Sequence, residues 1–502
     1  MTSRIPIRHG MAQRAALACA VALAVAGCSI PAKLGHPAIR DDVPLAGLQT
    51  ATRAGWPDAE WWRQYNDPQL DQLIAMAMKG SPDLTEAHAR IDSAQQSIRV
   101  AKAQAGLSVD GSAQVARQRL SDNGLIPPKF LGFTWYNQGD IGVQAQYDFD
   151  WWGKKRNTIE AAVDQAHAAE AQHSAAALAI QSTVADTYFG WLADEARIGI
   201  AKQSVQTQEQ LLRIAQLRVR QGVDRPDTVQ SAQAQLAATR QLLVALESSE
   251  RIRQAALASL LGVSPAQLPP MEPRALPATN SGLPDNVGVD LMARRPDIAA
   301  SRWQVESALR QTDVARAEFY PDISISAMAG LSSIDLDKMF SSGSRVFALT
   351  PALHLPIFTS GLLDANYGVS RAQLDTAVAQ YNSTVLSAAR DVATQSLTAQ
   401  QLDGRRKEQA HEISANQQLF DNAQARVKRG VSDIRETLGA KAQLLQLQDD
   451  DVNLHAQALS TDVSLIKALG GGYRASTPDQ VSSTPAPTSP ATLSGDATDE
   501  RH

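Results

Sequence analysis

The stretch RVRQGV at residues 218–223 recurs as RVKRGV at residues 426–431, which is 208 residues further along the chain. The segment LLG at 260–262 recurs as ALG at 468–470 with the same spacing. No gap is needed between the two matches. Self-similarity at a fixed spacing indicates an internal duplication. The sequence therefore predicts two copies of one structural unit.

Both copies begin with a Pro-Asp pair, in SPDL at 81–84 and in RPDI at 295–298. Proline suits the first position of a helix, and an aspartate beside it suits the positive end of the helix dipole. We therefore expect helices over 82–105 and 296–319. The spacing here is 214 rather than 208, so the first copy carries six extra residues before Gly153.

Two stretches, 141–149 and 323–329, alternate apolar and polar residues. This alternation predicts strands with one apolar face. Their partner strands are expected over 109–118 and 345–358, so each copy holds one hairpin. Pro351 lies inside the last stretch and argues for an irregular or shortened strand. Both hairpin loops are long, at 120–138 and 332–344.

Proline-free helical segments follow the hairpins at 157–220 and 364–429, and shorter ones return at 227–261 and 433–469. Such lengths favour coiled-coil-like packing. At 1.5 Å per residue the first long helix spans about 95 Å, and its return helix together with the Pro-Asp helix spans about 89 Å. Each copy is therefore expected to place one unbroken helix beside a two-part return. A belt of irregular chain, formed by the Pro-rich segment 263–294 and the segment before the first copy, would interrupt the return.

The N-terminus has the pattern of a secretion signal. Three arginines precede an apolar run at 15–26, and the small residues before Cys28 resemble a bacterial lipobox. We expect cleavage just before Cys28, acylation of that cysteine and placement in the outer membrane, because no aspartate follows it. An ordinary signal peptide with an incidental cysteine is the alternative.

The chain is accordingly divided into six parts. They are a signal peptide (1–27), a lipidated N-terminal and equatorial segment (28–80), repeat 1 (81–262), a Pro-rich linker (263–294), repeat 2 (295–470) and a disordered tail (471–502). The end of the chain is rich in Ser, Thr and Pro, which favours disorder.

Composition excludes several classes of protein. A net charge of −5 gives no reason to bind nucleic acid. No run of 18 apolar residues follows residue 30, which excludes a helical multi-span membrane protein but not a β-barrel, whose strands alternate. Four strands cannot close a barrel around a lumen, and lipid tolerates no open sheet edge. Other subunits must therefore complete the barrel if these strands lie in a membrane.

Aromatic residues gather at the expected strand ends, as in the interfacial girdle of a membrane barrel. A soluble sandwich with aromatic corners is the alternative. The set near the helices is Tyr147, Phe149, Trp151, Trp152, Phe319, Tyr320 and Phe358, and the set near the first loop is Phe130, Phe133 and Trp135.

The sequence carries no pattern of catalysis. It holds no HExxH, GxSxG, Walker A or GxGxxG motif, its nine histidines are scattered, and its two cysteines both lie near the N-terminus. We therefore predict that the protein is not an enzyme and that it has no catalytic site, no metal site and no cofactor.

The turns between the long helices and the return helices are more informative. Each has the form Arg-x-x-x-Gly followed by acids; glycine suits the left-handed residue that ends a helix, and an acid caps the next helix. These turns could also have a second role. The free end of a long helical rod is where a partner would dock, and acids there would line the mouth of any lumen. The residues are Arg218, Gly222, Asp224 and Asp227 in the first turn and Arg426, Gly430, Asp433 and Glu436 in the second, with Asp433 and Glu436 as the candidate aperture.

Three further motifs are Trp61-Trp62, DPQL at 67–70 and ARAEFYPDI at 315–323. Together with the Pro-Asp starts and the paired turns, they make residues 28–473 resemble the outer-membrane factors of tripartite efflux pumps. These are the TolC/OprM-like proteins, and the resemblance is to their NodT-like lipoprotein branch. It implies an α+β membrane protein: a homotrimer whose four strands per chain form a twelve-stranded outer-membrane barrel, continued by a long periplasmic α-helical barrel. It also implies a passive exit duct, with a periplasmic adaptor and an inner-membrane pump of the RND or MFS type as partners.

One position departs from the pattern of this family. Many relatives carry an aspartate late in the second turn that narrows the closed mouth, and the equivalent place here is Gly439. Asp433 or Glu436 would then take its role. Two alternatives to an efflux duct stay open: an outer-membrane duct for type I protein secretion, and a lipoprotein coiled-coil scaffold without a channel.

Overall fold

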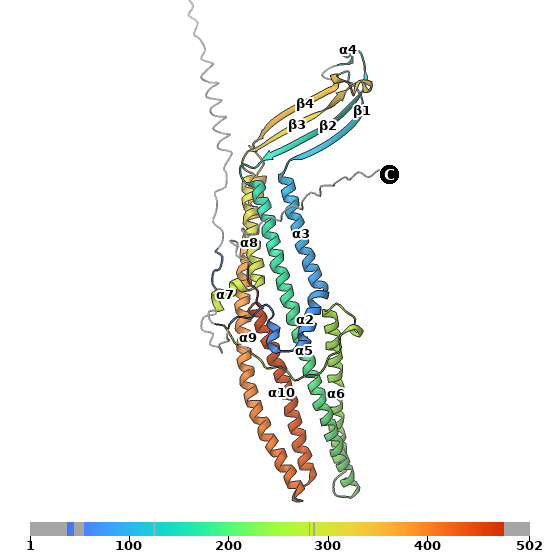
Figure 1. The fold of residues 1–502 in the computed structure, drawn as a ribbon, viewed down its shortest axis with the longest axis vertical. Helices are drawn as coiled ribbons and strands as arrows, with labels where there is room; N and C mark the ends of the chain where they lie inside the picture. Colours follow the sequence, from blue (N-terminus) through green and yellow to red (C-terminus); the bar gives the residue numbers. More distant parts are fainter. Residues whose placement is uncertain (1–37, 45–54, 124–126, 281, 285–286, 476–502) are drawn as a thin grey trace, which may run out of the picture.

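The computed structural model describes residues 38–44, 55–123, 127–280, 282–284 and 287–475. Figure 1 shows an elongated molecule with a β-sheet at one end and long helices that run to the other. The predicted signal peptide, Cys28 and the chain from residue 476 onward lie outside the described residues. Within the described residues, no helix is both long enough and apolar enough to span a bilayer.

The sheet has four antiparallel strands in the order β1-β2-β3-β4, which confirms the two predicted hairpins. They are β1 (Ser108–Arg119), β2 (Trp135–Phe149), β3 (Asp322–Ser333) and β4 (Arg345–His354). The first hairpin loop contains one helical turn, α4 (Pro128–Leu131), and the second contains η3 (Leu336–Lys338) and η4 (Ser342–Ser344).

The prediction for the last strand is partly wrong. β4 ends at His354 rather than at residue 358, but it runs regularly through Pro351, which pairs with Ile325. Proline lacks an N–H to donate, and it is tolerated in the outer strand of a sheet, where one side of the strand makes no ladder within the chain. The strand is therefore shortened but not irregular.

The six main helices repeat in two sets of three, and both long helices have 67 residues. The first set is α3 (Pro82–Ala105), α5 (Lys154–Arg220) and α6 (Asp227–Leu260), and the second is α8 (Pro296–Ala317), α9 (Leu362–Lys428) and α10 (Ile434–Ala468). The long helices begin earlier than predicted because Gly153 and Gly361, with φ of 76° and 80°, each turn the chain from its strand directly into the helix.

The elements form a single curved layer with two free edges. Near the sheet the helices lie in the order α3, α5, α8, α9, and toward the far end in the order α6, α5, α10, α9. One edge is therefore built from β1, α3 and α6, and the other from β4 and α9 (Figure 1). Both edges expose apolar side chains, such as Val244 and Ile252 on α6 and Leu397 and Leu419 on α9.

The equatorial belt is less irregular than predicted. It contains η1 (Trp61–Tyr65), α2 (Pro68–Gly80), η2 (Pro265–Gln267) and α7 (Val287–Arg294). The apolar stripe of α2 packs with Trp61, Tyr188 and Trp191 in the largest cluster of buried side chains. Burial of these side chains fixes the belt to the middle of α5 and to the C-terminal end of α10.

Buried hydrogen bonds fix the same region. Asp67 caps α2 through the N–H of Gln69 at 3.0 Å and also accepts a hydrogen bond of 2.7 Å from the hydroxyl of Tyr188. The hydroxyl of Tyr65 donates to the fully buried Asp462 of α10 at 2.8 Å. Buried polar groups stay stable only when they are paired in this way.

The duplication is visible where each return helix ends. Gly262 follows the end of α6 and Gly470 follows the end of α10, and both glycines have positive φ, of 70° and 94°. A Cβ on Gly262 would overlap the carbonyl oxygen of Gly80, and one on Gly470 would overlap the carbonyl oxygen of Arg294. Each return helix thus closes against the chain that leads into the Pro-Asp helix of its own copy.

Candidate functional site: the sheet faces and the helical turns

The strand register sorts the side chains of the sheet onto two faces. Val143 pairs with Gly111 on one side and with Ala329 on the other, and paired residues share a face. The face that holds Val143 also carries Ile141, Ala145, Ile325 and the corresponding residues of β4, and most of its residues are apolar. The opposite face carries the residues between them, including Gln144 and Gln146.

Charge is segregated between the same two faces. All four acids of the strands lie on the polar face, and all three arginines lie on the apolar face at the hairpin end of the sheet. The acids are Asp110, Asp140, Asp148 and Asp322, and the arginines are Arg117, Arg119 and Arg345. The polar face of the sheet, which also carries glutamines and serines, is therefore negatively charged.

The predicted aromatic set surrounds the helix end of the sheet. Trp152 stacks on Tyr320 with ring centroids 4.5 Å apart, and its Nε1 donates to the carbonyl of Pro321 at 2.8 Å. Tyr147 and Phe149 meet edge to face at 5.1 Å. Trp151 and Phe358 expose 68% and 86% of their surface, whereas Phe319 packs on Tyr367 of α9. The residues therefore form a collar between strands and helices, with Phe319 turned toward the helices.

The aromatic set of the first loop lies at the opposite end of the sheet. Phe130 in α4 and Trp135 at the start of β2 expose 72% and 54% of their surface. The guanidinium of Arg117 lies 5.5 Å from the ring centre of Trp135. Phe133 packs on Tyr136 instead.

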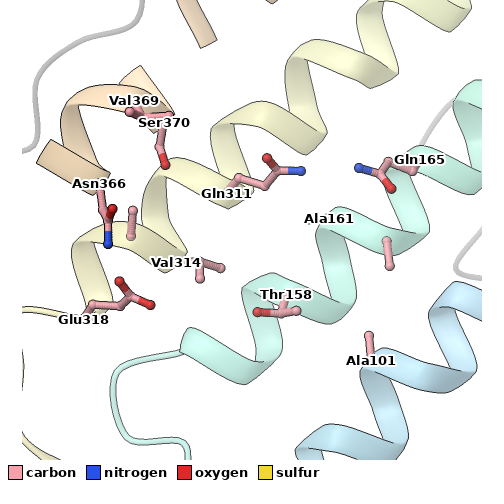
Figure 2. A pocket seen from close by; sticks show the side chains of 12 residues that line it. Ala101, Thr158, Ala161, Gln165, Gln311, Val314, Glu318, Asn366, Val369 and Ser370 are labelled. Atoms are coloured by element: carbon pink, nitrogen blue, oxygen red, sulfur yellow. The ribbon is translucent and has the colours of Figure 1, made fainter. Parts of the chain in front are cut away.

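The lining of a groove next to the sheet, on its helix side, shows no arrangement of side chains typical of a catalytic site. It measures about 500 Å³ and lies between α3, α5, α8 and α9 (Figure 2). Its lining is mostly alanine with uncharged polar side chains, such as Gln165 and Gln311. The charged residue in the lining is Glu318, which is paired with Lys154 at 3.3 Å. Within the described residues, no group of three potential metal ligands is present.

The two turns lie at the end of the molecule farthest from the sheet (Figure 1). Gly222 and Gly430 both have φ of 72°. The N–H that follows each glycine bonds back to the carbonyl of the matching arginine, Arg218 or Arg426, at 2.9 and 3.0 Å. The expected role of glycine in ending both long helices is therefore confirmed.

The prediction that an acid caps the next helix holds for only one of the two turns. Asp433 caps α10 by accepting the N–H of Arg435 at 2.9 Å. α6 has no side-chain cap, because Pro226 occupies its cap position and Asp227 is already the first residue of the helix. Asp227 pairs with Arg225 at 3.3 Å instead.

Ion pairs link the two turns across the layer. Arg218 donates two hydrogen bonds to Asp224, at 2.7 and 2.9 Å, and lies 3.7 Å from Asp433. Arg435 lies 2.9 Å from Asp433 and 3.7 Å from Asp224. The hydrogen bonds from Arg218 lower the pKa of Asp224, and the backbone N–H of Arg435 lowers the pKa of Asp433. Both acids therefore stay charged near neutral pH.

The other candidate aperture acid is also paired. Glu436 contacts Arg426 and the hydroxyl of Ser432, both in its own turn. Gly439 lies one turn further along α10, with open space where a side chain would project. The cations that compensate the acids are thus Arg218, Arg426 and Arg435.

One further link, between the helices α5 and α10 of the two copies, is not predicted from the sequence. Arg197 of α5 binds Asp449 of α10 through two hydrogen bonds, at 2.8 and 3.0 Å. The two residues are 252 positions apart, and no local pattern marks either of them. The run of three aspartates beginning at Asp449 is the available signal, and the first of them serves this ion pair.

The sequence profile of the outer membrane efflux protein family matches residues 73–263 and 287–471 of this chain. These two matches cover the two sets of helices and strands. The chain belongs to the outer membrane efflux protein family. The predicted duplication, the TolC-like fold and the efflux-channel function are therefore confirmed, and the family is non-enzymatic.

The comparisons with single proteins agree. The multidrug resistance outer membrane protein MdtP of Escherichia coli K12 is 33% identical over 467 residues, which cover 90% of this chain and 94% of MdtP. The outer membrane protein VceC of Vibrio cholerae is 33% identical with a TM-score of 0.75, over 83% of this chain and all of VceC. The CmeC outer membrane channel of Campylobacter jejuni has a TM-score of 0.80 at 21% identity, over 91% of this chain and 97% of CmeC, and supports the fold.

The chain is thus an outer membrane protein that extends into the periplasm. In this TolC-like fold the four-stranded sheet is the membrane part and the long helices are the periplasmic part. Channels of this family function as trimers within tripartite pumps. A scaffold without a channel is excluded by this membership.

Proposed function

We propose that this chain forms the homotrimeric exit duct of a multidrug efflux pump. The observation that carries the proposal is the pair of free edges on the single curved layer. An unpaired strand edge is not tolerated in lipid, so β1 of one copy must pair with β4 of the next. Three copies close twelve strands around a lumen, and the apolar edges of α6 and α9 meet below them.

The proposed cargo follows from the relatives. MdtP carries the name of a multidrug resistance protein. The acids on the polar face, which becomes the lumen wall, favour cationic over anionic solutes. The proposed partners are a periplasmic adaptor and an inner-membrane pump of the RND or MFS type, and the adaptor docks at the turns around Gly222 and Gly430.

The test uses a strain that lacks its own efflux channels and carries the adaptor and pump genes adjacent to this gene. Expression of the chain should lower the accumulation of a cationic dye and raise drug resistance. Appearance of a secreted protein in the medium, with dye accumulation unchanged, would support the type I secretion duct and contradict the multidrug proposal.

A lipid anchor at Cys28 is part of the proposal. Cys28→Ser should abolish fatty-acid labelling of the mature protein, because the cysteine thiol and its new amino group carry the acyl chains. The measurement is radiolabelled palmitate incorporation after immunoprecipitation, with Cys19→Ser as the matched control, which should label like the parent. Undiminished labelling of Cys28→Ser would contradict the anchor. The Cys28→Ser variant is still expected to insert into the outer membrane, because a β-barrel stays in the bilayer without an acyl anchor.

The aperture proposal is that Asp433 and Glu436 hold the periplasmic mouth closed. Asp433, at the start of α10, forms an ion pair with Arg218 of α5, so its charge joins the two helical turns of one chain. Asp433→Asn with Glu436→Gln should raise the single-channel conductance in planar bilayers and weaken cation preference. Some cation preference should remain, because the acids of the sheet are unchanged.

A control variant separates this role from helix capping. Asparagine caps a helix about as well as aspartate, so the double variant should keep the stability of α10. Asp433→Ala removes the cap as well and should cost about 1 kcal/mol. Parent-like conductance and selectivity in the double variant would show that these acids do not gate the mouth.

A further inference from the structure

The three arginines of the strands occupy positions where charge is costly. Arg117, Arg119 and Arg345 share the face of Val143, which faces lipid in a barrel. An arginine on the lipid face strongly destabilises a barrel at the midplane of the bilayer and much less near the interface. All three lie at the hairpin end of the sheet, opposite the helices, so they reach the outer surface of the membrane.

Their positions bring them together only in the assembly, so this inference rests on the proposed trimer. Arg117 and Arg119 end β1, which is one edge of the sheet, and Arg345 begins β4, which is the other edge. When β1 of one copy pairs with β4 of the next, the outward arginines of two chains meet at each seam. Three such seams then carry three arginines each.

Among the described residues, these three arginines form one ion pair with an acid. Arg119 lies 3.6 Å from Asp122, and the two side chains are 54% and 71% exposed, which makes the pair weak. The guanidinium of Arg117 lies 5.5 Å from the ring centre of Trp135, and a guanidinium that stacks on an aromatic ring can still donate hydrogen bonds from its edge. Like charges at one seam repel each other, so an anion with several oxygen acceptors would stabilise the site.

We infer that each seam binds the phosphate groups of the phosphorylated glycolipid of the outer leaflet, the lipid A class. Its acyl chains would lie on the apolar band below, which includes Phe347 and Leu349 of β4, both largely exposed in the single chain. Its phosphates would accept paired hydrogen bonds from the guanidinium groups above, for which arginine has the matching geometry. Trp135 provides the amphipathic ring that suits the boundary between the two zones.

The experiment uses the full-length mature protein purified in detergent and examined by native mass spectrometry. Diphosphorylated lipid A is added to the parent and to the double variant Arg117→Gln with Arg345→Gln. The parent trimer should bind up to three lipid A molecules, and the variant should bind them at least about tenfold more weakly, because two guanidinium groups that donate charge-assisted hydrogen bonds are lost at each seam.

The matched control replaces two exposed periplasmic arginines, Arg213→Gln with Arg251→Gln, and should bind like the parent. Equal binding by the parent and the seam variant would overturn the inference. Equal affinity for phosphatidylglycerol and lipid A would overturn the choice of ligand in favour of any anionic lipid. A parent that is not a trimer would overturn the proposed assembly itself, whereas an intact trimer without lipid preference would overturn only the inference.

Discussion

Val143→Arg is expected to remove most of the trimer from the outer membrane, whereas Gln144→Arg should leave it nearly unchanged. The two residues are adjacent in β2 but lie on opposite faces of the sheet. Val143 belongs to the apolar face that contacts lipid, near the middle of the band, where an arginine costs about 2–4 kcal/mol per chain. In a trimer this cost is paid three times. Gln144 faces the water-filled lumen, where a charge stays hydrated.

The measurement is the yield of heat-sensitive trimer in outer-membrane fractions on semi-native gels, normalised to total expression. Both variants add the same side chain to the same strand, so each is the control for the other. Equal losses for Val143→Arg and Gln144→Arg would show that the assignment of lipid and lumen faces is wrong. Equal yields at the parent level would show that this face does not contact lipid.

Gly262→Ala is expected to destabilise the protein far more than Gly222→Ala, although the two glycines have nearly the same φ, 70° and 72°. Both variants place a side chain in the left-handed region, which costs about 1–3 kcal/mol. At Gly262 the new Cβ would also overlap the carbonyl oxygen of Gly80, whereas at Gly222 it meets open space. Overpacking adds about 1–3 kcal/mol, because the end of α6 must move away from Gly80, the last residue of α2.

The expected difference is seen as a lower midpoint of thermal unfolding, followed by circular dichroism at the helix band in detergent. Gly470→Ala should behave like Gly262→Ala, since its Cβ would overlap the carbonyl of Arg294. Gly430→Ala is the second control, again with open space around the glycine. Midpoints that fall equally in all four variants would show that conformational strain dominates and that the contacts of Gly262 with Gly80 and of Gly470 with Arg294 contribute little.

The strands, the helices and their arrangement in two copies can be predicted from local patterns of residues. Alternation of apolar and polar residues predicts a strand with one buried or lipid-facing side, and proline followed by aspartate predicts the start of a helix. Both signals depend only on neighbouring residues, so they can be recognised in the sequence. The range 82–105 for α3 was predicted without error for this reason. The left-handed glycines at 222 and 430 were likewise predictable, since a helix that ends in a tight turn needs a residue without a Cβ.

The pairing of charged side chains that are far apart in the chain depends on how the helices pack. Asp224 and Asp433 both follow closely after a glycine that ends a long helix. Asp224 nevertheless binds Arg218, whereas Asp433 caps α10. The difference arises because Pro226 occupies the cap position of α6. The link between Arg197 and Asp449, and the sharing of Asp433 between Arg218 and Arg435, depend on how α5 packs beside α10. A local pattern records the turn of each backbone, but the partner of a charged side chain is set by packing between segments far apart in the chain.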